Sequence, residues 1–101
     1  MEVQLFHIKK TEVFSKWYKQ LKDIYAKKKN ALRITQTELG NFGDFKSIGD
    51  GVYEMRIDYG PGYRIYYTKE DKLIVLLLVG GDKTTQQKDI ELAKELKNEK
   101  K

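Results

Sequence analysis

Residues 52–68 decide the fold, and they read VYEMRIDYGPGYRIYYT. Apolar and polar side chains alternate on both sides of Gly60-Pro61-Gly62, which is the pattern of β-strands with one face against a core. The two glycines suit a tight turn because glycine adopts positive φ without strain. The stretch therefore predicts a β-hairpin.

The predicted strands are Val52–Tyr59 and Tyr63–Thr68, paired so that Tyr59 lies opposite Tyr63. The apolar face of this hairpin meets the core, and the polar face carries Glu54, Arg56, Asp58, Arg64, Tyr66 and Thr68. In this register Asp58 lies opposite Arg64, and Arg56 lies opposite Tyr66. The structural alternatives to functional roles for these arginines are thus an ion pair of Arg64 with Asp58 and an ion pair of Arg56 with Glu54 or Asp58.

The segments on either side of the hairpin predict the rest of the fold. A short strand at Phe45–Ile48 precedes it, and the apolar run Leu73–Val79 follows as a strand buried on both faces. The last predicted helix is Gln86–Lys97. The N-terminal half predicts a strand at Val3–Ile8, a helix capped by Thr11, and a second helix that begins at the cap Asp23 and ends near Leu39.

This order of elements predicts an α+β fold. A strand and two helices come first, a four-strand antiparallel meander follows, and a helix ends the chain, with two helices covering one face of the sheet. A chain of 101 residues has the size of one small domain, so we expect residues 1–101 to form a single unit.

The composition excludes several classes of site. The chain has no cysteine and one histidine, His7, which rules out disulfide scaffolds, cysteine nucleophiles and metal sites with several histidine ligands. No apolar run approaches 18 residues, which is about what a membrane-spanning helix needs. We therefore expect a cytoplasmic protein without membrane contact.

Positive charge is concentrated in the first half of the chain. The formal net charge is +5, and residues 1–45 hold nine Lys and Arg against five Asp and Glu. Such a surface attracts polyanions, of which RNA and an acidic protein are the obvious examples. The alternative is a solvated helix face that is merely rich in lysine.

Four blocks of the sequence resemble one known group of proteins. They are GNFGDFK at 40–46, GDGVYEMRI at 49–57, YGPGYRIYY at 59–67 and LLVGGDK at 77–83, followed by Gln86, Asp89, Ile90 and Ala93. Phe14, Trp17, Leu21 and Asp23 match the start of the same pattern. Together they resemble the addiction-module killer proteins, which form the HigB-like branch of the RelE/ParE toxin superfamily and are also grouped with phage-derived Gp49-like proteins.

The resemblance implies a RelE-like fold and a type II toxin. Its activity would be cleavage of mRNA, usually on the ribosome, as a hydrolase of the endoribonuclease class. A helix-turn-helix antitoxin would neutralise it, and no metal or other cofactor is expected.

The same resemblance suggests which residues act on RNA. Cleavage by the 2′-OH requires a proton acceptor, stabilisation of charge on the phosphorane oxygens, and a proton for the leaving 5′-oxygen. Arg64 matches the arginine of the RelE-like Gly-Tyr-Arg strand, and a guanidinium suits phosphate because it donates two bonds. The predicted catalytic residues are Arg64, Arg56, Lys83 and Asp89, and the predicted substrate-binding residues are Lys46 and Tyr66.

The chain departs from the RelE pattern at two positions. Glu54 stands where the prototype has a second lysine, and Asp89 stands where it has a tyrosine. A carboxylate at Asp89 could orient the RNA or move a proton, or it could simply favour the start of a helix. A non-catalytic protein on the same fold therefore stays open, either a ParE-like gyrase binder or an antitoxin-binding remnant.

Overall fold

The hairpin lies within a five-stranded sheet in the computed structural model, which describes residues 5–99. The strands are β1 (His7–Lys10), β2 (Phe45–Gly49), β3 (Val52–Ile57), β4 (Tyr63–Asp71) and β5 (Ile74–Gly81). Their order across the sheet is β1-β5-β4-β3-β2. Strands β2 to β5 form the predicted antiparallel meander, and β1 joins its edge in parallel with β5.

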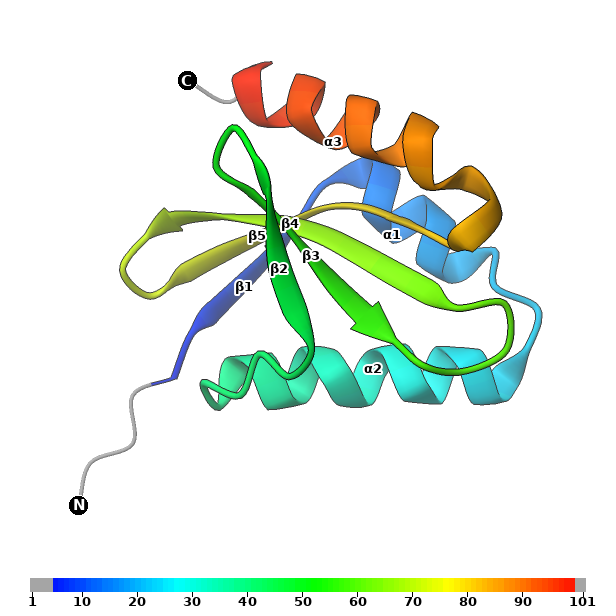
Figure 1. The fold of residues 1–101 in the computed structure, drawn as a ribbon. Coiled ribbons are helices and arrows are strands. Elements are labelled where there is room, and N and C mark those ends of the chain that lie inside the picture. Colours follow the sequence, from blue (N-terminus) through cyan, green and yellow to red (C-terminus); the bar gives the residue numbers. More distant parts are fainter. Residues whose placement is uncertain (1–4, 100–101) are drawn as a thin grey trace.

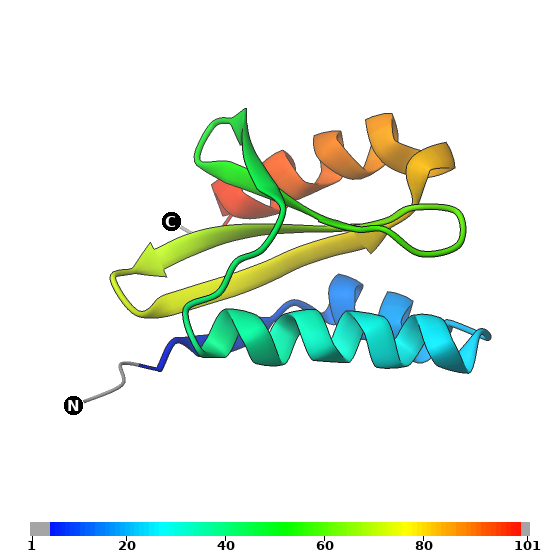
Figure 2. The same cartoon turned by 60° about the horizontal axis from the view of Figure 1, so that its bottom comes forward.

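Helices cover both faces of this sheet. The helices α1 (Glu12–Lys19) and α2 (Ile24–Glu38) lie on one face, and α3 (Gln86–Glu99) lies on the other, after the short 3₁₀-helix η1 (Lys83–Thr85). Figure 1 shows the connection from β1 into α1, and Figure 2 shows the three layers. The predicted α+β class and the two helices on one face are thus confirmed.

Both predicted helix caps are present. The Thr11 hydroxyl accepts a hydrogen bond of 3.0 Å from the backbone N–H of Phe14 and so begins α1. One Asp23 carboxylate oxygen accepts from the backbone N–H of Tyr25 at 2.9 Å and of Ala26 at 3.3 Å, which begins α2. These side chains satisfy N–H groups that a helix leaves free at its start.

The hairpin pairs two residues away from the predicted register. Ile57 lies opposite Tyr63, Arg56 opposite Arg64, and Glu54 opposite Tyr66. The predicted strand to Tyr59 is too long, because β3 ends at Ile57 and a five-residue loop replaces the three-residue turn. A shift of two keeps every side chain on its predicted face, since the side-chain period of a strand is two.

The first strand was also predicted too early in the chain. The structure has it at His7–Lys10, and Leu5 and Phe6 precede it. Val3 and Gln4, which the predicted strand includes, lie outside the described residues. The true position is set by the parallel pairing of His7 with Ile74 and of Ile8 with Val75.

The sheet separates two hydrophobic clusters. Residues of β3, β4 and β5 contribute to both, in alternation. The α1/α2 side contains Phe14, Ala26, Met55, Ile57, Tyr63, Ile65, Tyr67, Val75 and Leu77. The α3 side contains Val52, Tyr66, Leu76, Leu78, Val79 and Ala93. Strand β5 is therefore buried on both faces, as its unbroken apolar run predicts.

Two adjacent glycines let helices approach the sheet from opposite sides. A Cβ at Gly80 would lie 2.1 Å from the Trp17 ring of α1, and a Cβ at Gly81 would lie 1.8 Å from the Asp89 carboxylate of α3. Neither neighbour tolerates a methyl group at that distance.

No helix among residues 5–99 combines the length and apolar character that crossing a membrane requires.

Candidate functional site

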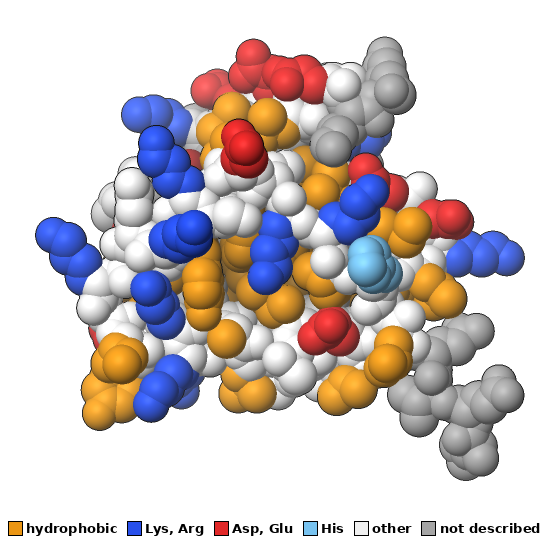
Figure 3. Space-filling view, turned by 180° about the vertical axis from the view of Figure 1, so that it is seen from behind, with side chains coloured by type: hydrophobic (Ala, Val, Ile, Leu, Met, Phe, Trp, Pro, Cys, Tyr) orange, Lys and Arg blue, Asp and Glu red, His pale blue; other side chains and the backbone are white. Residues whose placement is uncertain are grey.

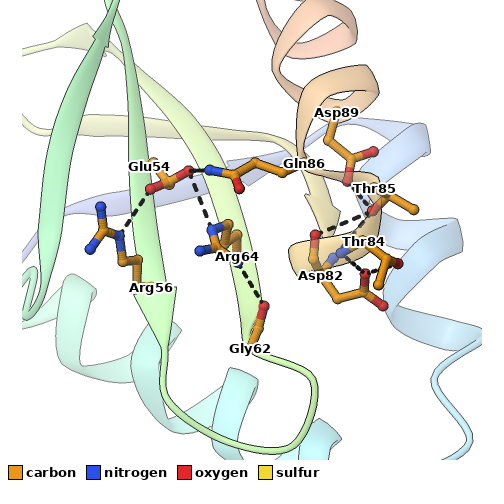
Figure 4. Close-up of polar contacts among 9 residues, drawn as sticks. All are labelled: Glu54, Arg56, Gly62, Arg64, Asp82, Thr84, Thr85, Gln86 and Asp89. Atoms are coloured by element: carbon orange, nitrogen blue, oxygen red, sulfur yellow. Dashed lines mark hydrogen bonds and ion pairs between the residues drawn. The ribbon is translucent and has the colours of Figure 1, made fainter.

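The two arginines of the hairpin face each other on the α3 side of the sheet. Arg56 of β3 and Arg64 of β4 are paired directly across the strands, where like charges repel. Glu54, one step along the same face of β3, lies between their guanidinium groups (Figure 4). Its carboxylate therefore offsets the repulsion that the register creates.

Glu54 is completely buried, and three donors surround its carboxylate. Arg56 Nε donates to Oε1 at 3.1 Å, and Gln86 Nε2 donates to Oε2 at 3.1 Å. Arg64 Nε lies 3.5 Å from Oε2 as an ion pair. A buried carboxylate is costly unless charges and hydrogen bonds compensate it, and here both oxygens are engaged.

This network corrects the predicted partner of Arg64. The ion pair forms with Glu54 and not with Asp58, because the two-residue change in register moves Asp58 out of β3 and into the loop. The ion pair of Arg56 with Glu54 is one of the predicted structural alternatives, and alternation indicates it because Glu54 shares a face with the arginines. Gln86 belongs to α3, 32 positions further along the chain, and no local pattern indicates its contact with Glu54.

The arginines border a surface hollow of about 260 Å³. The Arg56 side chain is 41% exposed and that of Arg64 is 14% exposed. Arg64 Nη1 donates to the Gly62 carbonyl at 3.1 Å, which fixes its guanidinium beside the loop. Both sides of the hollow also carry carboxylates, since it is lined by Asp44, Arg56, Ile57, Asp58, Gly62, Tyr63 and Arg64.

Lys83 lies next to Arg64, as the resemblance implies. A Cβ on Gly62 would be 3.7 Å from Arg64 Nη1 and 3.9 Å from the Lys83 Cβ, so the two cationic residues flank the same glycine. Lys83 is the first residue of η1 and is exposed. Asp82 caps η1 by accepting from the Thr84 N–H at 2.8 Å. The fold thus brings Arg56, Arg64 and Lys83 together.

Asp89 lies on the same side, against the glycine that pairs with Arg64. Gly81 is opposite Arg64 in the sheet, and the Asp89 carboxylate occupies the space where a side chain at Gly81 would be. Thr85 donates to Asp89 Oδ2 at 2.5 Å. Burial raises the pKa of Asp89, and the hydrogen bond from Thr85 opposes that shift.

The two predicted substrate-binding residues differ in their accessibility. Lys46 is exposed on β2 opposite Glu54, one strand outside the arginines, and does not line the hollow. Tyr66 is completely buried under α3, so its ring cannot stack on a base, which corrects that prediction. Its hydroxyl has no hydrogen-bond partner among residues 5–99. Burial, followed by the negative charges of Glu54 and Asp89, raises the pKa of Tyr66.

Arg33 supports the hollow from α2, a role that no local pattern in the sequence indicates. Its guanidinium donates to the backbone carbonyls of Phe42 at 2.9 Å, Asp44 at 3.3 Å and Arg56. Burial lowers the pKa of Arg33. Gly43 leaves room for this side chain, because a Cβ there would lie 2.7 Å from Arg33 Nη2. The backbone of Arg56 is therefore held by a residue that does not itself line the hollow.

The remaining titratable residues do not form a metal centre. Within residues 5–99 no three His, Cys, Asp or Glu side chains gather as metal ligands would. His7 lies on β1, at the opposite edge of the sheet from β2. The chemistry available at the hollow is therefore that of guanidinium, ammonium and carboxylate groups.

The fold is that of the RelE toxins. The structure of a double mutant of the E. coli toxin RelE in the free state superposes with a TM-score of 0.67, covering 86% of this chain and 96% of that one at 15% identity. The chain belongs to the family of phage-derived Gp49-like proteins (DUF891), whose model matches residues 25–98. An uncharacterized protein of Haemophilus influenzae is 50% identical over 92 residues, which are 91% of this chain and 93% of that protein. The predicted membership of the Gp49-like family and the predicted RelE-like fold are thus confirmed.

Proposed function

We propose that this protein is the toxin of a type II toxin–antitoxin pair and that it cleaves mRNA without a metal ion. The observation that carries the proposal is that Arg56 and Arg64 line one hollow of a RelE-like fold, while Lys83 lies beside Gly62 at its border. Guanidinium and ammonium groups stabilise the charge that develops on a phosphate during cleavage.

In the proposed reaction, the 2′-oxygen attacks the adjacent phosphorus while a base takes its proton. The O2′–P bond forms, the P–O5′ bond breaks, and the 5′-oxygen receives a proton. The products are a 2′,3′-cyclic phosphate and a 5′-hydroxyl. Arg64 and Arg56 bind the non-bridging oxygens, and Lys83 adds positive charge beside them.

Two carboxylates take different roles in this proposal. Glu54 holds both arginines through their Nε atoms, so the terminal nitrogens of Arg56 and Nη2 of Arg64 remain available for phosphate, whereas Arg64 Nη1 donates to Gly62. Asp89 moves a proton or orients the RNA, and its raised pKa suits an acid–base group better than an ordinary aspartate does. Lys46 binds the RNA backbone further along β2.

We further propose that the protein is a HigB-like, cytoplasmic toxin that acts on ribosome-bound mRNA and is neutralised by a helix-turn-helix antitoxin. The family match and the fold support this setting. A short reading frame with a helix-turn-helix pattern next to the gene is expected. Its co-expression should restore growth that the toxin alone arrests.

The test is to map the ends of RNA from cells arrested by induced expression. We expect new 5′-hydroxyl ends, with 2′,3′-cyclic phosphate or 3′-phosphate on the other fragment. Purified protein should still cut free RNA in excess EDTA, if it acts off the ribosome. Fragments with 5′-phosphate and 3′-hydroxyl ends, or unimpaired growth with abundant folded protein, contradict the proposal.

One observation favours a second function. Asp44 and Asp58 line the same hollow as Arg56 and Arg64, so its charge is closer to balance than a phosphate site needs. A non-catalytic protein on this fold, which binds gyrase or only its antitoxin, fits such a balance. Growth arrest with unbroken mRNA and inhibited DNA supercoiling would select the gyrase-binding function.

A further inference from the structure

Three consecutive lysines of α2 each lie over a tyrosine ring, although the three rings come from different elements. Lys27 Nζ is 5.8 Å from the ring centroid of Tyr18 in α1, and Lys28 Nζ is 5.9 Å from that of Tyr25 in α2 itself. Lys29 Nζ is 5.7 Å from the ring of Tyr59, in the loop between β3 and β4. We call these six residues the Lys–Tyr ridge.

The ridge spreads around the helix because successive residues of an α-helix point about 100° apart. Lys27 is directed to α1, Lys28 lies over its own helix, and Lys29 reaches the β3–β4 loop. Figure 3 shows the molecule from behind the view of Figure 1, and basic side chains gather there on the side of α1 and of the start of α2. Acidic side chains gather instead over α3 in that view.

One end of the ridge adjoins the candidate site. Tyr59 lies in the loop whose neighbouring residues Asp58 and Gly62 line the hollow. The Tyr59 hydroxyl donates to Asp23 Oδ2 at 3.0 Å, which ties this loop to the start of α2. A bound chain that leaves the hollow past this loop therefore meets Lys29, the ridge lysine that lies over Tyr59.

The ridge lysines keep their charge available. Among residues 5–99, no carboxylate forms an ion pair with Lys27, Lys28 or Lys29. Asp23 is the nearest acidic residue in the sequence, and its carboxylate already caps α2 and accepts from Tyr59. Lys28 and Lys29 are exposed, and the Tyr25 side chain is 63% exposed.

We infer that the Lys–Tyr ridge binds the RNA strand that is being cut, where it continues beyond the hollow. Ammonium groups bind the phosphates, and the Tyr25 ring offers a stacking surface for a base, which is how proteins hold single strands without reading their sequence. This inference rests on the proposed function. An acidic protein segment would use the lysines, but it has no comparable use for an exposed tyrosine ring.

The experiment compares uridine oligonucleotides of three and twelve residues, with 2′-O-methyl groups that prevent cleavage. The wild type should bind the dodecamer more tightly than the trimer. Changing Lys27, Lys28 and Lys29 to Ala should remove that advantage, about tenfold or more at low salt, and leave trimer binding unchanged. The slope of log affinity against log salt should fall by about 2, since each single-strand phosphate contact contributes about 0.7.

Lys72, Lys94 and Lys97 form the matched control. Their change to Ala removes the same charge from the β4–β5 turn and from the C-terminal half of α3, so dodecamer affinity should change less than about twofold. Lysine to alanine favours a helix, so circular dichroism should report folded protein in both cases. Tyr25→Ala should weaken dodecamer binding about fivefold or more, whereas Tyr25→Phe should retain it.

Several outcomes would overturn the inference. Equal losses in the two triple variants would mean that only net charge matters. Unchanged dodecamer binding would leave the ridge free for a protein partner. Lost affinity for ribosomes with unchanged dodecamer binding would assign the ridge to ribosomal RNA. A ridge variant that binds the dodecamer as tightly as the wild type and still yields the same RNA cleavage products would overturn the role of the ridge. The proposed function would then still stand.

Discussion

The two faces of the sheet are built from the same strands but serve different purposes. On the α1/α2 face, Met55, Ile57 and Ile65 pack in a continuous core. On the α3 face, the residues between them in the sequence include Glu54 and both site arginines. Burial is nearly complete on the first face, whereas the second has its own core and, beside it, a charged network open to solvent at one end.

The difference teaches that a polar position on an alternating strand can be as buried as an apolar one. Glu54 and Tyr66 are both completely buried on the polar face, because α3 covers that part of the sheet. At the end of β3 and the start of β4, Arg56 and Arg64 line the hollow and are partly exposed. The hollow is therefore the part of the charged network on the second face that is open to solvent.

Among the variants that test this difference between the two faces, Arg64→Ala should have the largest effect, which is on the rate of RNA cleavage. Loss of a charge-stabilising donor typically lowers the rate about 100- to 1000-fold, or about 2.7–4 kcal/mol of barrier. From the sequence alone, the variant should keep its fold intact because Arg64 lies on a polar face. The structure changes this expectation: without Arg64 the buried Glu54 loses one counterion, which costs about 1–3 kcal/mol of unfolding free energy.

A double variant separates the two roles of Arg64. Adding Glu54→Gln to Arg64→Ala removes the stranded charge, so stability should recover while activity stays low. Urea unfolding and growth arrest at matched protein levels measure the two effects. Recovery of toxicity together with stability would show that Arg64 only neutralises Glu54.

Substitutions of the adjacent glycines should have effects of intermediate size on thermal stability and on RNA cleavage. Each substitution tests one face of the sheet. Gly80→Ala forces a methyl group into the Trp17 ring, and Gly81→Ala forces one into the Asp89 carboxylate. Overpacking of a core costs about 1–3 kcal/mol. We expect the larger loss of thermal stability from Gly80→Ala and the larger loss of RNA cleavage, per folded molecule, from Gly81→Ala. The opposite order would mean that Asp89 is structural and that α1 supports the site.

Much of the fold is predictable from the sequence because alternation fixes faces independently of register. The predicted faces of the hairpin hold although its pairing is displaced by two residues. Tyr59 lies in the loop instead of the strand, and there its hydroxyl donates to Asp23, 36 positions away in the chain. A pattern of apolar and polar residues carries no information on such a contact.

The site was predictable to a smaller extent. Arg56, Arg64, Lys83 and Asp89 share one side of the sheet because their strands and α3 adjoin there. Their grouping follows from the family resemblance rather than from alternation. Gln86 and Arg33 were missed, since each acts through a contact between elements far apart in the chain. Whether the predicted catalytic residues act on RNA stays a prediction.

Asp89→Asn should have the smallest effect, a pH-dependent change in the free energy of unfolding. The pKa of Asp89 is raised by burial in the folded protein, so the folded state favours the protonated carboxyl. A group of this kind supports folding most at acid pH, and that support is lost as the pH rises through its folded-state pKa. At neutral pH the ionised Asp89 therefore opposes folding slightly. Asparagine carries no charge and can still accept from Thr85. The free energy of unfolding of the variant should therefore equal that of the wild type or exceed it by about 0.5 kcal/mol or less.

Thermal unfolding of both proteins across the acid-to-neutral range measures this difference, which should vanish at low pH. The cleavage rate supplies the second readout. If Asp89 accepts the 2′-OH proton, the wild-type rate falls on acidification through the raised pKa, and the Asn variant lacks that limb. If the rate of the Asn variant also falls on acidification, Asp89 does not accept the proton and only orients the RNA. A variant that is less stable than the wild type at neutral pH would show that the ionised carboxylate, through Thr85, helps to hold α3 against the sheet.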